Sequence, residues 1–149
     1  MANVGVIGAG SWGTALSVLL HDNGHQVTIW SIDPEEVKML AEEREHKKKL
    51  PGVKLSEDMV ITGNLEAAVH EKMFLYLRFR LRLHERLRKK MAPYIVVGQI
   101  IVDVAKGIEE DTLLTLSEQI RQEIPQADVA VLSGPSHAEE VGRNFRQPV

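Results

Sequence analysis

A chain of 149 residues, 44% of them hydrophobic and 26% charged, is long enough for one globular domain with a sizeable core. A formal net charge of −3 excludes a broad attraction to nucleic acid or anionic membranes, and the absence of cysteine from the sequence excludes disulfides, thiolate catalysis and cysteine-bound metals. No apolar run approaches the roughly 20 residues of a membrane span, so we expect a cytoplasmic protein.

Apolar runs and turn signals predict strands that alternate with helices. In chain order the expected elements are a strand at 4–7, a helix at 12–23, a strand at 27–30, a helix from 34 to about 44, strands at 59–62 and 99–104, a helix at 113–123 and a strand at 129–132. Such alternation is typical of βαβ units. We therefore expect an α/β fold with a doubly wound, mostly parallel sheet.

Residues 8–13 read Gly-Ala-Gly-Ser-Trp-Gly, a G-x-G-x-x-G motif between a predicted strand and a predicted helix. In this context Gly8 allows a tight turn, Gly10 lets the backbone approach a pyrophosphate, and Gly13 lets the helix pack closely on the strand. The helix N-terminus then offers free N–H groups to the anion. A glycine turn that binds nothing is the alternative. We expect a Rossmann-type dinucleotide-binding domain over residues 1–149.

Asp33 lies 20 residues after Gly13 and has two interpretations. An acid at the end of the second strand binds the ribose 2′-hydroxyl of NAD, but Asp33 before Pro34 is also a favourable helix N-cap. The lysine run at residues 47–49 is either a source of charge for the 2′-phosphate of NADP or a solvated surface. The sequence favours NAD and leaves NADP open.

Two further loops follow predicted strands, and ligands of open α/β sheets bind outside the carboxyl ends of the strands. In the first loop, Lys106 either meets an anionic substrate or the cofactor, or is a solvated lysine. In the second, the backbone of Gly134 and the hydroxyl of Ser136 are candidates for binding a phosphate. The alternative is that Ser136 caps the next helix, with Glu139 completing a capping box, and both interpretations can hold together. His137 is a candidate acid–base residue for which no partner is identified.

Four segments together resemble the bacterial NAD(P)-dependent glycerol-3-phosphate dehydrogenases. They are GAGSWGTAL at 8–16, LPG at 50–52, AKGIE at 105–109 and LSGPSHAEEV at 132–141. The resemblance covers nearly the whole chain, apart from residues 73–90 and the last five. The family interconverts sn-glycerol 3-phosphate and dihydroxyacetone phosphate by hydride transfer to or from a nicotinamide cofactor. The resemblance therefore implies an NAD(P)-dependent oxidoreductase of glycerophospholipid metabolism.

The resemblance also assigns residues to the site. The implied cofactor contacts are Ser11, Trp12, Asp33, Lys49, Lys106 and Ala138. The implied substrate contacts are Lys106, Gly134 and Ser136. Family members often carry a basic residue near Asp33 and an aromatic at Lys49, so this chain departs from the pattern there. The family's acid–base lysine sits in an all-helical second domain, so we expect no catalytic residue and no metal here. The expected partner is a small phosphate substrate, and a homodimer is a possible state of the intact enzyme.

Residues 73–90 do not match the family. Where the family reads Asp-Val-x-x-x-Ala-Val-Pro-Ser, this chain has Arg78, Arg80 and Arg82, and unpaired burial of such charges in a core strand is costly. One interpretation is a half-exposed edge strand. The other is a shifted reading frame, since suitable codons for residues 73–80, read one nucleotide earlier, give Asp-Val-Phe-Ile-Leu-Ala-Val-Pro. A similar shift hides Leu-Pro-Thr-Ala within residues 144–148. We favour the shifted frame, which also explains an early stop.

The sequence thus predicts the cofactor-binding half of a glycerol-3-phosphate dehydrogenase. A non-catalytic NAD(H)-binding module is the alternative from another class, and the expected lack of a second domain favours it. A related dehydrogenase acting on 3-hydroxyacids is a third interpretation, against which Lys106 and residues 133–140 argue.

Overall fold

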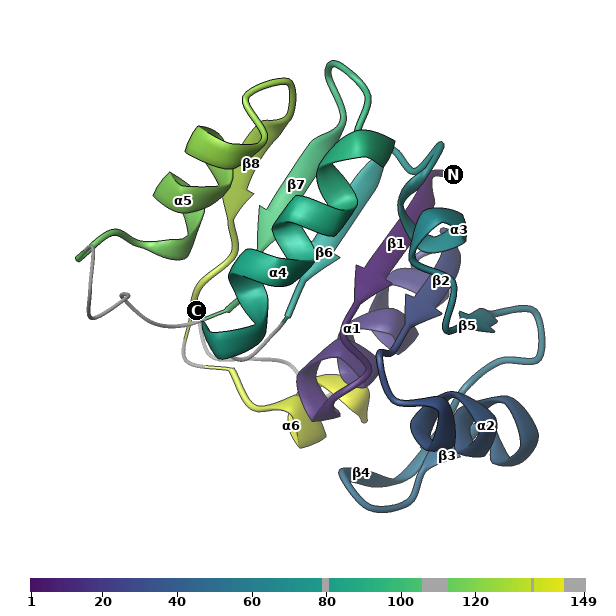
Figure 1. The fold of residues 1–149 in the computed structure, drawn as a ribbon. Helices are drawn as coiled ribbons and strands as arrows, with labels where there is room; N and C mark the ends of the chain where they lie inside the picture. Colours follow the sequence, from purple (N-terminus) through teal and green to yellow (C-terminus); the bar gives the residue numbers. More distant parts are fainter. Residues whose placement is uncertain (79–80, 106–112, 135, 144–149) are drawn as a thin grey trace.

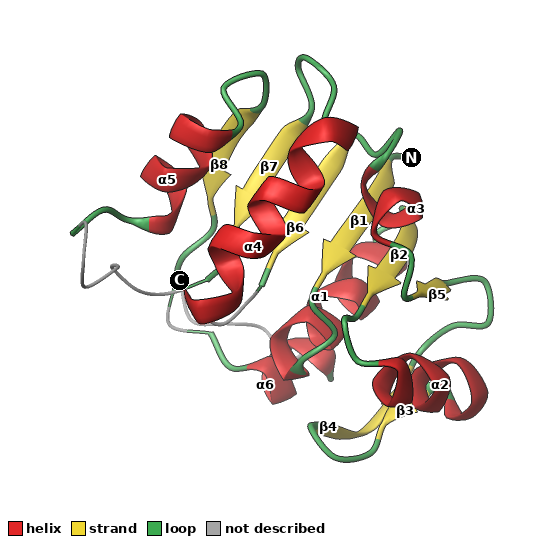
Figure 2. Cartoon of the chain, in the orientation of Figure 1, coloured by secondary structure: helices red, strands yellow, loops and turns green. Residues whose placement is uncertain are grey.

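The structure is a computed structural model that describes residues 1–78, 81–105, 113–134 and 136–143 (Figure 1). In this part of the chain, helices lie on both sides of a sheet of strands (Figure 2). Of the described helices, none is long and apolar enough to cross a membrane.

Six parallel strands of the described chain form the central sheet, in the order β5-β2-β1-β6-β7-β8. Their bounds are β1 (Asn3–Ile7), β2 (Gln26–Trp30), β5 (Val60–Thr62), β6 (Phe74–Leu77), β7 (Ile100–Asp103) and β8 (Asp128–Val131). The chain winds outward from β1 to β5, returns beside β1 as β6, and winds outward again to β8. This is the doubly wound Rossmann order, so the predicted fold class is confirmed. The order reverses between β1 and β6, the point at which such sheets bind ligands.

Helices cover both faces of the sheet (Figure 1). Their bounds are α1 (Ser11–Asp22), α2 (Pro34–Glu43), α3 (Leu65–Val69), α4 (Leu81–Met91), the 3₁₀ helix η1 (Ala92–Tyr94), α5 (Leu116–Glu123) and α6 (Ala138–Gly142). Helices α1 and α6 pack together on one face, whereas α3, α4 and α5 lie on the other. Because side chains alternate along a strand, Val4 and Val6 enter the core with α1, and Leu75 and Leu77 enter the core beneath α4.

The strand β6 lies in the middle of the sheet, between β1 and β7, so the edge-strand interpretation is wrong. Leu75 and Leu77 of this strand are fully buried. Arg78 follows the strand directly, Arg82 belongs to α4, and Arg80 lies outside the described residues. Arg78 and Arg82 therefore follow the core strand and do not interrupt it. The shifted reading frame stays a prediction.

Several elements were not predicted: the two-stranded hairpin of β3 (Glu45–His46) and β4 (Leu50–Lys54), the helix α3, and the helix α4. The predicted helix at 113–123 begins only at Leu116, because Thr115 and Glu118 form a capping box at its start. The remaining predicted elements are confirmed, and their bounds differ from the prediction by at most one residue at either end. The hairpin lies beside α2, away from the main sheet (Figure 1), and its Leu50 packs near Gly142 of α6.

Candidate functional site

The glycine turn joins β1 to α1. Gly8 has a φ of 120°, which other residues rarely adopt, and its N–H donates to the carbonyl of Trp30 at 3.0 Å. A Cβ on Gly13 would lie 1.9 Å from the carbonyl oxygen of Gly8, so α1 packs as closely on the turn as the motif predicts. Gly10 differs, since a Cβ there would meet no described heavy atom within 4 Å and its φ of −68° suits any residue. Gly10 therefore leaves open space beside the N-terminus of α1.

A cavity of about 340 Å³ opens in front of this turn, and we call it the glycine-turn cavity. Its walls come from the turn, the residues that follow β2, the hairpin, and the residue that follows β6. It is lined by Gly8, Ala9, Gly10, Ser11, Trp12, Trp30, Ser31, Ile32, Glu36, Lys49, Arg78 and Leu87. It lies at the carboxyl ends of β1, β2 and β6, where ligands of this fold bind.

A second cavity, of about 400 Å³, adjoins the first, and we call it the α6 cavity. It lies between α1, α6 and the residues that follow β7 and β8. It is lined by Ser11, Trp12, Leu16, Leu19, Arg78, Val104, Leu132, Ser133, Gly134, Ser136, His137, Ala138 and Val141. Ser11, Trp12 and Arg78 line both cavities, so the two meet at the start of α1.

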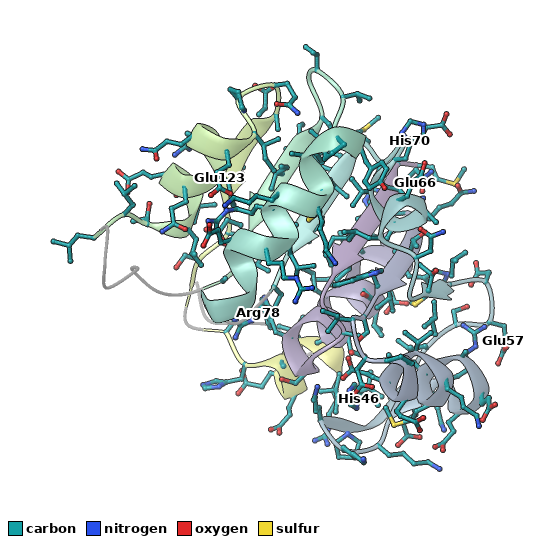
Figure 3. All side chains as sticks on the ribbon, viewed as in Figure 1. His46, Glu57, Glu66, His70, Arg78 and Glu123 are labelled. Atoms are coloured by element: carbon teal, nitrogen blue, oxygen red, sulfur yellow. The ribbon has the colours of Figure 1, made fainter. Side chains whose placement is uncertain are left out.

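Arg78 is the cation at this junction. Its backbone N–H donates to the carbonyl of Ile7 at 3.0 Å, which holds it at the end of β6 beside the glycine turn. Figure 3 shows Arg78 between α4 and the start of α1. Burial raises the pKa of the nearby Asp103 carboxyl, against smaller lowering effects of the Ala105 N–H and the Arg78 charge. In the sequence Arg78 stands out only as a charge next to a core strand. The residues around Arg78 do not show that β6 pairs with β1 and therefore ends beside the glycine turn.

Glu36 of α2 carries the negative charge of the glycine-turn cavity. Its Oε1 accepts a hydrogen bond from Nζ of Lys49 at 2.6 Å and lies 2.7 Å from Nε2 of His46, and its Oε2 accepts from the Ser31 hydroxyl. Burial alone would raise the pKa of Glu36, but the hydrogen bonds from Lys49, Ser31 and His46 together hold it below its ordinary value. Glu36 is therefore ionised at neutral pH. Two of its partners, His46 and Lys49, follow Glu36 by 10 and 13 residues. They lie on the hairpin, which the sequence did not predict.

The structure brings most of the predicted site residues together. Those that line one or both cavities are Gly8, Gly10, Ser11, Trp12, Lys49, Gly134, Ser136 and Ala138. Asp33 is not among the lining residues, and its Oδ1 caps α2 by accepting from the Glu35 N–H at 3.0 Å. Lys106 lies outside the described residues.

The predicted cap of α6 is wrong. The N-cap is His137, not Ser136, and no side-chain capping bond is formed there in the described chain. The capping box with Glu139 is therefore not formed, because the helix begins one residue later than that pattern requires. His137, the candidate acid–base residue, lines the α6 cavity and is exposed.

Comparisons with family models and with known proteins show the family of this chain. The family model described as "NAD-dependent glycerol-3-phosphate dehydrogenase N-terminus" matches residues 3–146. The glycerol-3-phosphate dehydrogenase [NAD(P)+] of Agathobacter rectalis is 54% identical over 143 residues, which are 96% of this chain and 43% of that protein. The Fusobacterium nucleatum enzyme of the same name is 48% identical over 97% of this chain and 44% of its own length. The crystal structure of glycerol-3-phosphate dehydrogenase from Coxiella burnetii superposes with a TM-score of 0.91 at 29% identity, covering 98% of this chain and 45% of that one. The chain thus spans less than half the length of these relatives.

Proposed function

Because the chain belongs to the family of NAD-dependent glycerol-3-phosphate dehydrogenases and matches their N-terminal part, we propose that it is the cofactor-binding half of such an enzyme. The proposed ligand is NAD(H) or NADP(H), bound across the glycine-turn cavity and the α6 cavity. The observation that carries the proposal is the open space at Gly10, in a cavity at the N-terminus of the 12-residue helix α1.

The residues of the turn fit a pyrophosphate. A Cβ at Gly10 would stand in free space, so its absence leaves room for an anion to approach the backbone. The first N–H groups of α1 have no partner within the helix and point toward that space, where the positive end of the helix dipole also favours an anion. Arg78, at the junction of the two cavities, adds a full positive charge for a phosphate.

The proposed site joins the two cavities. Its proposed cofactor contacts are Gly8, Gly10, Ser11, Trp12, Lys49, Lys106 and Ala138, with Gly13 supporting the turn. Asp33, which the resemblance also implies, instead caps α2. Ser11 and Trp12 support a ligand that crosses from one cavity to the other, because they line both. The adenosine ribose belongs beside the end of β2, as in other sheets of this order. The nicotinamide then belongs in the α6 cavity.

For the intact enzyme we propose reversible hydride transfer between sn-glycerol 3-phosphate and dihydroxyacetone phosphate. Bound NAD(P) supplies the hydride acceptor. The loop of Gly134 and Ser136 would hold the substrate phosphate beside the nicotinamide, since both residues line the α6 cavity. Lys106 would add a charge for the same phosphate. The proton that leaves the substrate hydroxyl needs a general base, which the resemblance assigns to a second, helical domain.

Calorimetric titration of the 149-residue chain with NADH tests the binding proposal. We expect wild type to bind and Gly10→Val to lose about tenfold or more in affinity, the equivalent of about 1.4 kcal/mol. Gly63→Ala is the control, because Gly63 lines neither cavity among the described residues and a Cβ there makes only ordinary contacts at 3.9 Å. Circular dichroism melts check that each variant folds.

Failure of the folded wild-type chain to bind either NADH or NADPH would reject the proposal, as would equal affinities for wild type and Gly10→Val. Binding without turnover by the intact gene product would instead favour the non-catalytic module.

A further inference from the structure

The carboxylate of Glu36 stands at one end of the glycine-turn cavity, beside the end of β2. Its side chain is 11% exposed, and its three hydrogen-bonding partners come from the loop after β2 and from the hairpin. Ser31 and Lys49 line the same cavity. Glu36 is thus a fixed carboxylate on the cavity wall, held by hydrogen bonds from Ser31 and from the hairpin.

The charge of Glu36 is offset mainly by Lys49. The Lys49 backbone N–H donates to Nδ1 of His46 at 3.3 Å, so Nδ1 acts as an acceptor. Nε2 of the same imidazole faces Oε1 of Glu36 at 2.7 Å. The first turn of α2 also carries the carboxylates of Asp33 and Glu35. Of the described residues that line this end of the cavity, Glu36 and Lys49 are the charged ones, and they are paired with each other.

Arg78 does not change that balance at the β2 end. It follows β6, whereas Glu36 follows β2, and β1 with its glycine turn lies between the two strands. Arg78 also lines the α6 cavity, which Glu36 does not, so the cation lies toward the middle of the combined site. The pyrophosphate of a bound dinucleotide belongs near the turn, and its adenosine ribose belongs near the end of β2.

We propose that Glu36 is the residue that makes this chain bind NAD(H) in preference to NADP(H). The inference rests on the proposed function. A ribose 2′-hydroxyl can donate to Oε2 of Glu36, which already accepts from Ser31 but retains acceptor capacity. A 2′-phosphate at the same place would meet a fixed like charge, and the ammonium of Lys49, which lines the cavity, is already bound to Glu36. Asp33, to which the sequence pattern pointed, uses its carboxylate to cap α2.

The experiment is a pair of calorimetric titrations, with NADH and with NADPH, on the 149-residue chain and its variants. We expect wild type to bind NADH more tightly than NADPH. Glu36→Gln should strengthen NADPH binding and so lower the ratio of the NADPH dissociation constant to the NADH dissociation constant by about tenfold or more. Glu35→Gln is the matched control, because Glu35 lies in the same turn of α2 but is exposed and does not line the described cavity. Asp33→Asn keeps a good capping residue and should leave the ratio near that of wild type.

Lys49 provides a second and independent test. Glu36→Gln releases its ammonium toward a 2′-phosphate, so adding Lys49→Met to that variant should abolish the gain in NADPH affinity. Lys49→Met alone should increase the preference for NADH, and its 51% exposed side chain makes the fold insensitive to the change. This variant decides the matter even if Glu36→Gln does not fold.

The outcomes separate the two proposals. If the folded wild type binds neither nucleotide, the proposed function fails. If it binds both with equal affinity, or if NADH still binds while Glu36→Gln and Lys49→Met leave the ratio unchanged, the function stands and the role of Glu36 is rejected. A change in the ratio on Asp33→Asn alone would move that role back to Asp33.

Discussion

The guanidinium of Arg88 on α4 binds the carboxylate of Glu123 on α5 through two hydrogen bonds, Nε to Oε2 at 2.5 Å and Nη2 to Oε1 at 3.1 Å. The Arg88 side chain is 2% exposed and that of Glu123 is 28% exposed. The Nη1 atom of Arg88 is buried with no hydrogen-bonding partner in the described chain. The helices α4 and α5, which lie on the same face of the sheet, are thus joined by an ion pair whose cation is far more buried than its anion.

This asymmetry predicts unequal effects of removing the two partners. Glu123→Ala strands a buried guanidinium and should lower the free energy of unfolding by about 3–5 kcal/mol, whereas Arg88→Met leaves a carboxylate that can turn to solvent and should cost clearly less. Urea denaturation measures both. Lys89→Met is the control, because its pair with Glu85 is exposed and such pairs contribute about 0–1 kcal/mol. Equal losses for the two variants would show that the pair does not bury its cation as described.

The glycine turn predicts opposite tolerances at two of its positions. Gly13→Ala would bring a Cβ to 1.9 Å from the Gly8 carbonyl oxygen, so α1 has to shift and the melting temperature should fall. Overpacking of this kind costs about 1–3 kcal/mol. Gly10→Ala meets no described atom within 4 Å and should lower stability by less, by about 0.5–1 kcal/mol, because alanine is a poorer helix N-cap than glycine. Thermal melts that rank the two variants the other way would contradict this packing.

Glu36 also predicts how stability changes with pH. Because its hydrogen bonds hold its pKa in the folded state below its ordinary value, ionised Glu36 stabilises the fold. That contribution is fully present above the unfolded-state pKa of about 4.3 and is lost as the pH falls through the lower folded-state pKa. The difference in unfolding free energy between wild type and Glu36→Gln should therefore be greatest near neutral pH and shrink in acid. Urea titrations at several pH values from neutral to acid measure this difference. If the difference between wild type and Glu36→Gln stays constant, ionised Glu36 does not stabilise the fold.

The shifted reading frame predicts that residues 73–81 can be improved. Replacing them with Asp-Val-Phe-Ile-Leu-Ala-Val-Pro-Ser should raise the melting temperature and tighten NADH binding, although the replacement removes Arg78 from the junction of the cavities. Thermal melts and calorimetry measure the two effects. A less stable product, or a gene with one unbroken frame whose relatives share these arginines, would show that the segment is genuine.

The 149-residue chain alone is expected to bind cofactor without turning over substrate. The reason is that the resemblance assigns the acid–base lysine to a second domain. Removal of a general acid–base group by itself lowers a rate by about 10²–10⁴-fold. Oxidation of NADH in the presence of dihydroxyacetone phosphate, followed by absorbance, measures this. Rapid turnover by the purified chain would place the acid–base group within these residues, where His137 lines the α6 cavity.

The sequence by itself determined the features that depend on near neighbours in the chain. The glycine turn, the Asp33 cap and most strands and helices follow from residue types within a few positions of one another. Even a local pattern failed at Ser136, since its capping signal competes with a helix start one residue later, at a position fixed by packing on α1.

Only the tertiary structure decided which distant residues meet. Sheet order places β6 beside β1, which turns Arg78 from an apparent flaw in a strand into the cation between two cavities. The hairpin returns His46 and Lys49 to Glu36, and the packing of α4 beside α5 joins Arg88 to a residue 35 positions away. Such contacts depend on how whole elements pack. The hydrophobic periodicity of one element shows which of its faces is buried, but not which other element packs on that face.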